Sequence, residues 1–321
     1  MLKKIEKEVE RIKKKLFYSG KTHKHLEEIQ YELENLPYEL YDKIVNNKFS
    51  VQVPKIKSIE DTLDKIIDDK CSIARFGDGE FACMNGSRIS FHDPDKGLAE
   101  RLKEVISSDI PNLLIGLPDC FGSLDCYVSY TRKFWRKYMS KKRRMTYSYL
   151  DMDRVYYNAF FNRYYLNFNK TDEFYQKCSA YIKRLKEMWK ARDVVLIESQ
   201  KAQLGVENDL FDEVKSISRI IFCPVRNSFK KYDQILSAFD GINSDVLVLA
   251  ALGPTATVLA YDLCKKGYQA IDIGHISEEY ECFLRKEKPM ELKDMGQNCK
   301  LKHDSNPDDS EYKKQIIHKI V

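Results

Sequence analysis

The sequence predicts an α/β fold in which helices cover both faces of a mainly parallel sheet. From about residue 55 onward, short apolar runs alternate with stretches of helical periodicity. Several runs are nearly continuous in Val, Ile and Leu, as in strands that are buried on both faces. The order strand, helix, strand, helix favours crossover connections, and these make neighbouring strands parallel.

Composition agrees with one main globular domain and an appendage. The 321 residues are 43% hydrophobic, 12% aromatic and 32% charged, which excludes general disorder. The formal charge of +5 is too small for a nucleic-acid-binding surface. The nine cysteines include no C-x-x-C pair, so neither a zinc site nor a disulfide framework is expected. No apolar run approaches the roughly 20 residues of a membrane span, and we expect a cytoplasmic protein without a transmembrane segment.

Residues 1–54 are predicted to form an amphipathic helical appendage. Two sets of apolar residues recur at helical spacing on either side of Gly20. They are Ile5, Val9, Ile12 and Leu16, followed by Leu26, Ile29, Leu33 and Leu36. The pattern predicts two helices, either a hairpin packed on its own domain or a coiled-coil segment that binds a second copy or a partner enzyme.

Residues 55–290 are predicted to form the main domain, and residues 291–321 a polar tail. The predicted strands are Ser72–Phe76, Asn112–Leu117, Met145–Leu150, Asp193–Glu198, Ser218–Cys223, Asp245–Ala250 and Gln269–Ile273. The predicted helices include Lys96–Ser107, Tyr127–Tyr138, Phe229–Phe239 and Pro254–Lys266. In such sheets the ligand lies beyond the carboxyl ends of the strands, so functional residues are expected there.

The segment after the first of these strands is the first candidate site. Asp78 and Glu80 are two residues apart, so in an extended loop both carboxylates point the same way. Gly77 and Gly79 leave room for a ligand to approach the backbone N–H groups. Paired carboxylates suit Mg²⁺ or Mn²⁺ shared with phosphate oxygens, and Arg75 adds a charge for the same phosphates. An ordinary Asp-Gly turn explains these residues equally well.

A second acidic pair, Asp151 and Asp153, follows the predicted strand Met145–Leu150. Its D-x-D spacing is the one that many nucleotide-sugar enzymes use. The favoured alternative is that these aspartates cap the next helix, because Asp is a preferred N-cap residue.

Further polar residues follow other predicted strands. Gly253 and Thr255 begin a helix whose N–H groups and dipole suit a phosphate, although a plain strand-to-helix turn is favoured. Glu198 ends a strand, and Asn208 and Asp209 after it are candidates for hydrogen bonds to a sugar or ribose. Helix capping is the simpler explanation for the latter two.

The segment after the last predicted strand of the main domain offers acid–base candidates. His275 lies directly beyond a strand end, where a histidine can bind a metal or phosphate or move a proton. Glu279 and Glu281 are candidate general bases, although a helix start also favours acidic residues. The chain has no G-x-G-x-x-G fingerprint and no Walker A sequence, which argues against a dinucleotide-dependent oxidoreductase.

Taken in order, these segments resemble the bacterial GT-D-fold glycosyltransferases, a family first catalogued as a domain of unknown function. The resemblance runs from about Ser72 to Phe283. The motifs that carry it are Ser72–Glu80, Leu204–Phe211, Cys223-Pro224 with Asn227, Leu252–Ala256, and Ile271–Ile276 with Glu279–Glu281. Five ordered motifs in one chain are more specific than any one of them alone.

The resemblance implies a Rossmann-like domain that transfers a hexose from a UDP-sugar to an acceptor hydroxyl of a glycan or glycopeptide. It implies that Asp78 and Glu80 form a D-x-E motif holding a divalent metal, normally Mn²⁺. It makes His275 a partner of the metal-diphosphate group, with His275, Glu279 or Glu281 as the base for the acceptor proton. Arg163 matches an arginine of the family pattern.

The sequence departs from the family pattern at four positions. Gln203 replaces a usual arginine, Glu207 a glycine, Ser277 an aspartate and Cys282 a tryptophan. The first two substitutions exchange a cation and open space for an amide and an acid, which implies a changed specificity or a reduced activity. Two other functions remain open: a GT-A-type transferase that uses Asp151 and Asp153, and a non-catalytic scaffold that recruits partner enzymes through the N-terminal helices.

Overall fold

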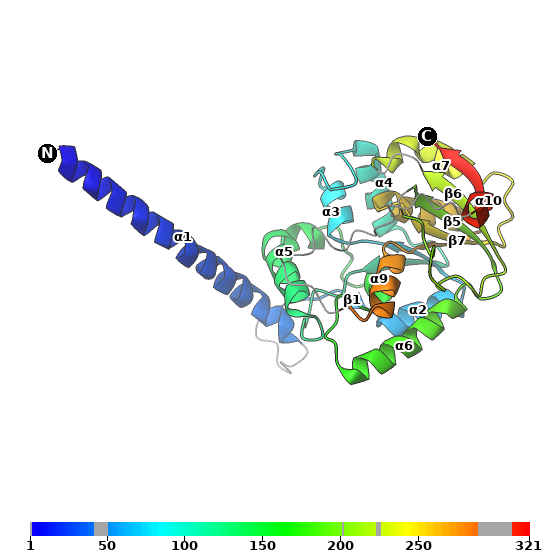
Figure 1. The fold of residues 1–321 in the computed structure, drawn as a ribbon, viewed down its shortest axis with the longest axis horizontal. Helices are drawn as coiled ribbons and strands as arrows, with labels where there is room; N and C mark the ends of the chain where they lie inside the picture. The colour runs from blue at the N-terminus through cyan, green and yellow to red at the C-terminus, as the bar shows by residue number, and fades with distance from the viewer. Residues whose placement is uncertain (1, 42–50, 201, 223–225, 288–309) are drawn as a thin grey trace.

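The structure is a computed structural model that describes residues 2–41, 51–200, 202–222, 226–287 and 310–321 (Figure 1). For residues 2–19, 21, 310 and 311 it describes the backbone alone. Part of the Cys223-Pro224 motif and most of the predicted polar tail therefore lie outside the described residues.

In the described part of the chain, nine parallel strands form one sheet, which confirms the predicted α/β class. Their order across the sheet is β1-β4-β3-β2-β8-β7-β5-β6-β9. The strands are β1 (Lys55–Ile56), β2 (Ser72–Arg75), β3 (Leu113–Leu117), β4 (Val155–Asn158), β5 (Asp193–Ser199), β6 (Ser216–Phe222), β7 (Leu247–Ala251), β8 (Gln269–Asp272) and β9 (Ile316–Ile320). Six of the seven predicted strands are present within two residues of their predicted bounds.

Helices cover both faces of this sheet (Figure 1). They are α1 (Leu2–Glu39), α2 (Ile59–Ile67), α3 (Asp78–Met84), α4 (Lys96–Ser107), α5 (Ser129–Tyr147), α6 (Asp172–Glu187), α7 (Tyr232–Ser237), α8 (Pro254–Lys265), α9 (Ile276–Leu284) and α10 (Ser310–Gln315). Short 3-10 helices include Ala159–Asn162 and Ser228–Lys231.

Two hydrophobic cores form because successive strand side chains point to opposite faces. In β5, Val195 and Ile197 join the core under α4 and α8, whereas Val194 and Leu196 join the core under α2 and α6. Each core is lined by a stripe of one helix face, such as Leu98, Leu102 and Val105 on α4 and Leu63 and Ile66 on α2. The continuous apolar runs in the sequence reflect this burial on both sides.

The strand predicted at Met145–Leu150 is wrong. Helix α5 continues to Tyr147, and the strand that occupies this place in the sheet is β4, a few residues later. Trp135, Met139 and Thr146 are buried along one face of α5 at spacings of four and seven residues. The apolar residues at the end of this run therefore continue a helical stripe.

The helical break predicted at Gly20 is also absent. A single helix, α1, runs from Leu2 to Glu39 through Gly20, so the hairpin prediction is wrong. A glycine inside a helix costs only about 1 kcal/mol relative to alanine, which is too little to end a long helix by itself. Among the described helices, none combines the length and apolar character that crossing a membrane requires.

The C-terminal segment is more ordered than a polar tail. Strand β9 pairs in parallel with β6 and covers the sheet edge there, with Ile320 buried. The run from Ile316 to Val321 contains four β-branched residues, which favour a strand once an unpaired edge is available.

Candidate functional site

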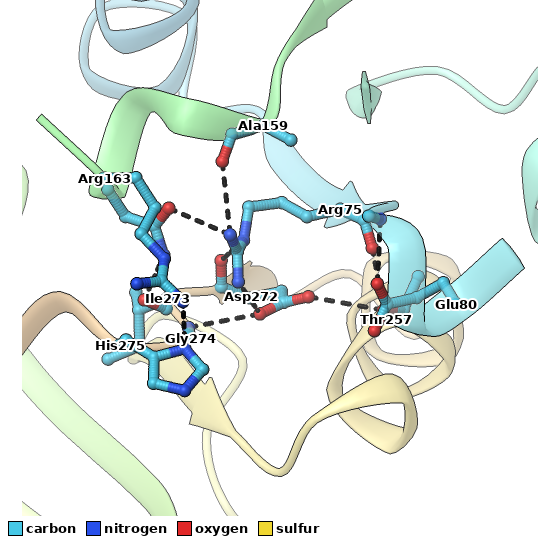
Figure 2. A network of polar contacts seen from close by, with 11 residues as sticks. Arg75, Glu80, Ala159, Arg163, Thr257, Asp272, Ile273, Gly274 and His275 are labelled. Atoms are coloured by element: carbon cyan, nitrogen blue, oxygen red, sulfur yellow. Dashed lines mark hydrogen bonds and ion pairs between the residues drawn. The ribbon is translucent and has the colours of Figure 1, made fainter. Parts of the chain in front are cut away.

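Residues that follow β2, β4 and β8 converge beyond the carboxyl ends of these strands (Figure 2). Asp78 and Glu80 open α3 just after β2, His275 follows β8, and Arg163 follows the 3-10 helix after β4. Strands β4, β3, β2 and β8 are consecutive in the sheet, and their parallel direction brings all their carboxyl ends to the same edge of the sheet. The topology therefore gathers two carboxylates, an arginine and a histidine from distant parts of the chain.

Asp78 and Glu80 lie in the first turn of α3, so the extended loop predicted for them is wrong. Residues two apart on a helix do not point the same way, so the alignment predicted for the two carboxylates is lost as well. Gly77 is the N-cap residue, and its backbone N–H donates a 2.8 Å hydrogen bond to Glu80 Oε2. A glutamate at the third helical position commonly closes a helix start in this way. Asp78 is exposed beside it, and Glu80 is half-buried.

Nearby positive charges do not fully balance the negative charges of Asp78 and Glu80. Desolvation, together with the nearby Asp272 and Asp78, raises the pKa of Glu80 to about 7 against the opposing effects of a backbone hydrogen bond and of Arg75. Desolvation also raises the pKa of Asp78, although Arg163 acts in the opposite direction. A cation beside these carboxylates would lower the energy of their charged forms.

This environment predicts a pH effect on the metal-free protein. The pKa of Glu80 is about 7 in the folded chain against 4.5 for an ordinary glutamate, so ionisation destabilises the fold as pH rises through that interval. Glu80→Gln removes the ionisation and keeps an oxygen for the Gly77 N–H. In urea titrations with EDTA, the variant should gain stability over the wild type at pH 8, and the gain should shrink at pH 5. An equal difference at both pH values would contradict the environment assigned to Glu80.

Arg75 holds the strand ends together, because all three guanidinium nitrogens bond within the protein. Its Nε donates to the Asp272 carbonyl at 2.7 Å, and its Nη2 donates to Asp272 Oδ1 at 2.9 Å. Its Nη1 donates to Asn162 Oδ1 at 2.9 Å. The guanidinium thus links the ends of β2 and β8 to the segment after β4. Gly274 lies against it with a φ of +46°, where a Cβ atom would collide with Arg75 Nη2.

Arg163 and His275 form a pair whose protonation follows from geometry. Arg163 Nη2 lies 3.0 Å from His275 Nδ1. Since a guanidinium only donates, Nδ1 must accept, and the ring proton of the neutral imidazole is on Nε2. The charge of Arg163 is the main cause that holds the pKa of His275 well below its usual value, followed by desolvation and Arg75. His275 therefore presents an N–H donor, and this corrects its predicted use as a general base.

Glu279 orients this pair and is too enclosed to act as the predicted base. Its side chain is fully buried, and Oε2 accepts the backbone N–H groups of Tyr165 at 2.9 Å and Leu166 at 2.8 Å. Its Oε1 lies 3.5 Å from Arg163 Nη1. Burial raises the pKa of Glu279, while Arg163 and the two backbone donors lower it. The carboxylate thus fixes the segment that carries Arg163.

Three other predicted ligand residues have protein partners in this structure. Glu198 is buried and pairs with Arg219 at 2.6 Å, and it accepts the Leu204 N–H at 2.6 Å. Asn208 caps its own turn by accepting the Leu210 N–H at 3.1 Å. Asp209 binds Lys186 at 2.8 Å and the Tyr280 hydroxyl at 2.6 Å. The three side chains thus have partners within the protein, and their contact with a nucleotide-sugar stays a prediction.

The remaining predicted acidic residues are Glu281, Asp151 and Asp153. Glu281 is partly buried on α9, 3.4 Å from Arg285. Asp151 and Asp153 precede β4 and therefore lie at the opposite edge of the sheet from Asp78. Asp151 Oδ1 accepts the Asp153 N–H at 2.9 Å, so this pair forms a turn rather than the cap of a helix.

Gly253 and Thr255 begin α8, and Gly253 has the positive φ of +56° expected at a sharp turn. Thr255 is buried, and its hydroxyl lies 2.7 Å from the Ser228 hydroxyl and 3.3 Å from His92 Nε2. Burial lowers the pKa of His92 and favours its neutral form. His92 could not be predicted from the sequence, because it follows no predicted strand and belongs to no recognised motif.

The donor set fits a metal that is shared with a ligand. No group of three or more His, Cys, Asp or Glu side chains in the part of the chain that the structure describes is placed to hold a metal alone. Mg²⁺ and Mn²⁺ need only one or two protein carboxylates when water and phosphate oxygens complete the shell. Asp78 and Glu80 match that requirement in oxygen chemistry and in their uncompensated charge.

The departures from the family pattern occupy strained or buried positions. Gln203 and Glu207 have positive φ angles of 42° and 63°, a region that favours glycine. Gln203 is buried, and its Oε1 has no hydrogen-bond partner among the described residues. Ser277 accepts the Gly205 N–H at 3.2 Å, and Cys282 is buried beside Glu287.

Comparison with known proteins identifies related sequences. A family model described as "Glycosyltransferase GT-D fold" matches residues 73–298. Glycosyltransferase GlyD of Streptococcus pneumoniae serotype 4 is 35% identical over 232 residues, which are 72% of this chain and 28% of that protein. A probable glycosyl transferase, Gly, of Streptococcus gordonii is 37% identical over 232 residues, 71% of this chain and 33% of that protein. The chain thus spans about a third or less of the length of these relatives.

Solved structures agree with the sequence comparison. The conserved domain of unknown function 1792, described as having a distinct glycosyltransferase fold, superposes with a TM-score of 0.75 at 33% identity. That match covers 84% of this chain and 96% of the other. A glycosyltransferase with this domain from Streptococcus sanguinis gives a TM-score of 0.74 at 33% identity, covering 84% of this chain and 100% of the other.

Proposed function

This chain belongs to the family of GT-D-fold glycosyltransferases, and we propose that it transfers a hexose from a UDP-sugar to an acceptor hydroxyl with the help of a divalent metal. The observation that supports this proposal is that Asp78 and Glu80 follow β2 at the same strand ends as the Arg163–His275 pair, whose arginine lowers the pKa of Asp78. Carboxylates for a metal and donors for phosphate oxygens are the two groups that a nucleoside-diphosphate donor requires.

Asp78 and Glu80 would hold the ion, normally Mn²⁺ or else Mg²⁺. A bound metal supplies positive charge next to the diphosphate oxygens. The ionised Glu80 side chain keeps its contact with the Gly77 N–H, so the start of α3 stays fixed while its carboxylate serves the site. Binding in turn favours the charged carboxylates that burial disfavours.

Arg163 and His275 Nε2–H would donate to diphosphate oxygens as negative charge grows on the leaving group. Donors that are already oriented contribute several kcal/mol, roughly, to such a step. Glu279 fixes Arg163, and Arg163 fixes the tautomer of His275. Of the three bases that the sequence suggested, Glu279 is fully buried, whereas Glu281 is 14% exposed and pairs with Arg285, and we assign the acceptor proton to Glu281.

Substitution of His275 tests the donor role. His275→Ala should lower kcat by on the order of 100-fold, the usual effect of losing one oriented donor. His275→Gln keeps an N–H group and should retain more activity than alanine. The matched control is His25→Ala, on the exposed surface of α1, which should leave kcat unchanged. If glutamine and alanine variants lost equal activity, a donor role for His275 would be excluded.

The function itself is tested by a donor screen. Release of nucleoside diphosphate is followed for several UDP-sugars, with a glycan or glycopeptide acceptor, with and without EDTA. We expect turnover of at least one UDP-hexose, suppressed by EDTA and restored by Mn²⁺. Turnover that persists unchanged in EDTA would rule out the proposed metal. If none of the donors were hydrolysed or used for transfer, the proposed reaction would be ruled out.

A further inference from the structure

Helix α1 extends away from the domain and leaves an apolar seam uncovered. Figure 1 shows it projecting from the domain, with only its C-terminal end beside α5. There Glu39 accepts two hydrogen bonds of 2.6 Å from Arg136, and Asn35 accepts one of 2.6 Å from Arg143. Asn35 is buried in this contact. These bonds fix which face of α1 is turned toward the domain.

The apolar seam lies on the other side of the helix. At about 100° per residue, Leu26 and Leu33 lie roughly opposite Asn35. The four residues of the seam are exposed by 58% at Leu26, 52% at Ile29, 63% at Leu33 and 47% at Leu36. A helix whose apolar stripe faces water gains stability by burying that stripe against another helix.

The charges of α1 divide sharply along its length. Residues 2–24 contain nine Lys and Arg residues against three Glu, a net charge of +6. Residues 25–41 contain five Glu residues and no Lys or Arg, a net charge of −5. Glu28 and Glu39 pair with Lys133 and Arg136 of α5, and Glu27, Glu32 and Glu34 are the acidic residues offered to a partner. The basic half also carries its own apolar set, Ile5, Val9, Ile12 and Leu16, with the same alternating spacings of three and four residues.

We propose that α1 pairs with α1 of a second copy of this chain in an antiparallel coiled coil. In that orientation the basic half of each helix lies along the acidic half of its partner, and the two apolar sets face each other on either side of the midpoint. A parallel pair would place like charges together in both halves, which disfavours it. The 38-residue helix is about 57 Å long, so the overlap spans both charged halves. An anionic membrane would suit the basic half and repel the acidic half.

Zero-length carbodiimide cross-linking of the full chain tests orientation directly. Lys15 and Glu27 are 12 residues apart, about 18 Å along one straight helix, so a bond between them can form only between two copies. Digestion and mass spectrometry of a mixture of ¹⁵N-labelled and unlabelled protein should show mixed cross-links from Lys13, Lys14 or Lys15 to Glu27, Glu32 or Glu34. A dimer without any such cross-link would overturn the antiparallel orientation.

Sedimentation measurements test the pairing itself. The wild type should be a dimer whose dissociation constant rises at least several-fold between 50 mM and 500 mM NaCl, because salt screens the attraction between the basic and acidic halves. Ile29→Asp combined with Leu33→Asp should give a folded monomer by circular dichroism. Leu284→Asp on α9, exposed by 47%, is the matched control and should stay dimeric. A monomeric wild type, whether or not it sediments with phosphatidylserine vesicles, would overturn the proposal.

Discussion

Replacing Asp78 by Asn together with Glu80 by Gln should reduce transferase activity by on the order of 100-fold to 1,000-fold. Removing one well-placed electrostatic group from an active site has an effect of this size. The amides keep the shape of both side chains, and Gln can still accept the Gly77 N–H that Glu80 caps. The fold should therefore survive, and the loss should appear in kcat/KM at every Mn²⁺ concentration tested.

The matched control for this variant is Asp151→Asn. Asp151 and Asp153 have the rival D-x-D spacing but lie at the opposite edge of the sheet. Their substitution should leave activity near that of the wild type. The reverse pattern, with activity lost in Asp151→Asn and kept in the double amide variant, would assign the metal to the other pair.

Glu198→Ala should destabilise the fold by about 3–5 kcal/mol, the cost of leaving a buried partner charge unpaired. Glu198 and Arg219 are both almost completely buried and 2.6 Å apart. Arg219 also donates to the Leu204 carbonyl at 3.1 Å, so the pair holds the loop that follows β5. Urea unfolding followed by circular dichroism measures the effect.

Asp193→Asn provides the control at the other end of the same strand. Asp193 pairs with Lys215 at 2.7 Å, but both side chains are exposed, and exposed pairs contribute little. The unfolding midpoint should hardly change. In addition, Glu198→Met combined with Arg219→Met should be less destabilising than Arg219→Met alone, because no charge is left behind. If the loss of stability in the double variant equalled the sum of the losses in the two single variants, the pair would not be tightly coupled.

The parallel sheet was predictable because most of its strands have a recognisable local sequence pattern. Runs such as Val194–Ile197 are apolar on both faces, and Gly267 marks the end of α8. The strand predicted at Met145–Leu150 was wrong because a run of six residues is too short to distinguish a strand from the end of a helix with one buried face. Strand β9 was missed because its stability depends on the open edge of β6, which lies far away in the sequence.

The site was predictable in part for the same reason. Asp78, Glu80 and His275 each follow a recognisable strand, so the rule of carboxyl strand ends found them. The roles of Arg75, Glu198 and Glu279 were not predictable, because they depend on partners about 20 to 200 residues away. Spacing alone does not reveal whether a charged side chain faces a ligand or a buried partner.

The central claim is that the turn formed by Gly77 to Glu80 binds nucleotide through a divalent metal. Calorimetric titration of UDP into the full chain measures this most directly, with Mn²⁺ and then with EDTA. We predict binding in the wild type and in Asp151→Asn only when Mn²⁺ is present, and none in Asp78→Asn with Glu80→Gln. Mn²⁺-dependent UDP binding that persists in the double amide variant would contradict the claim.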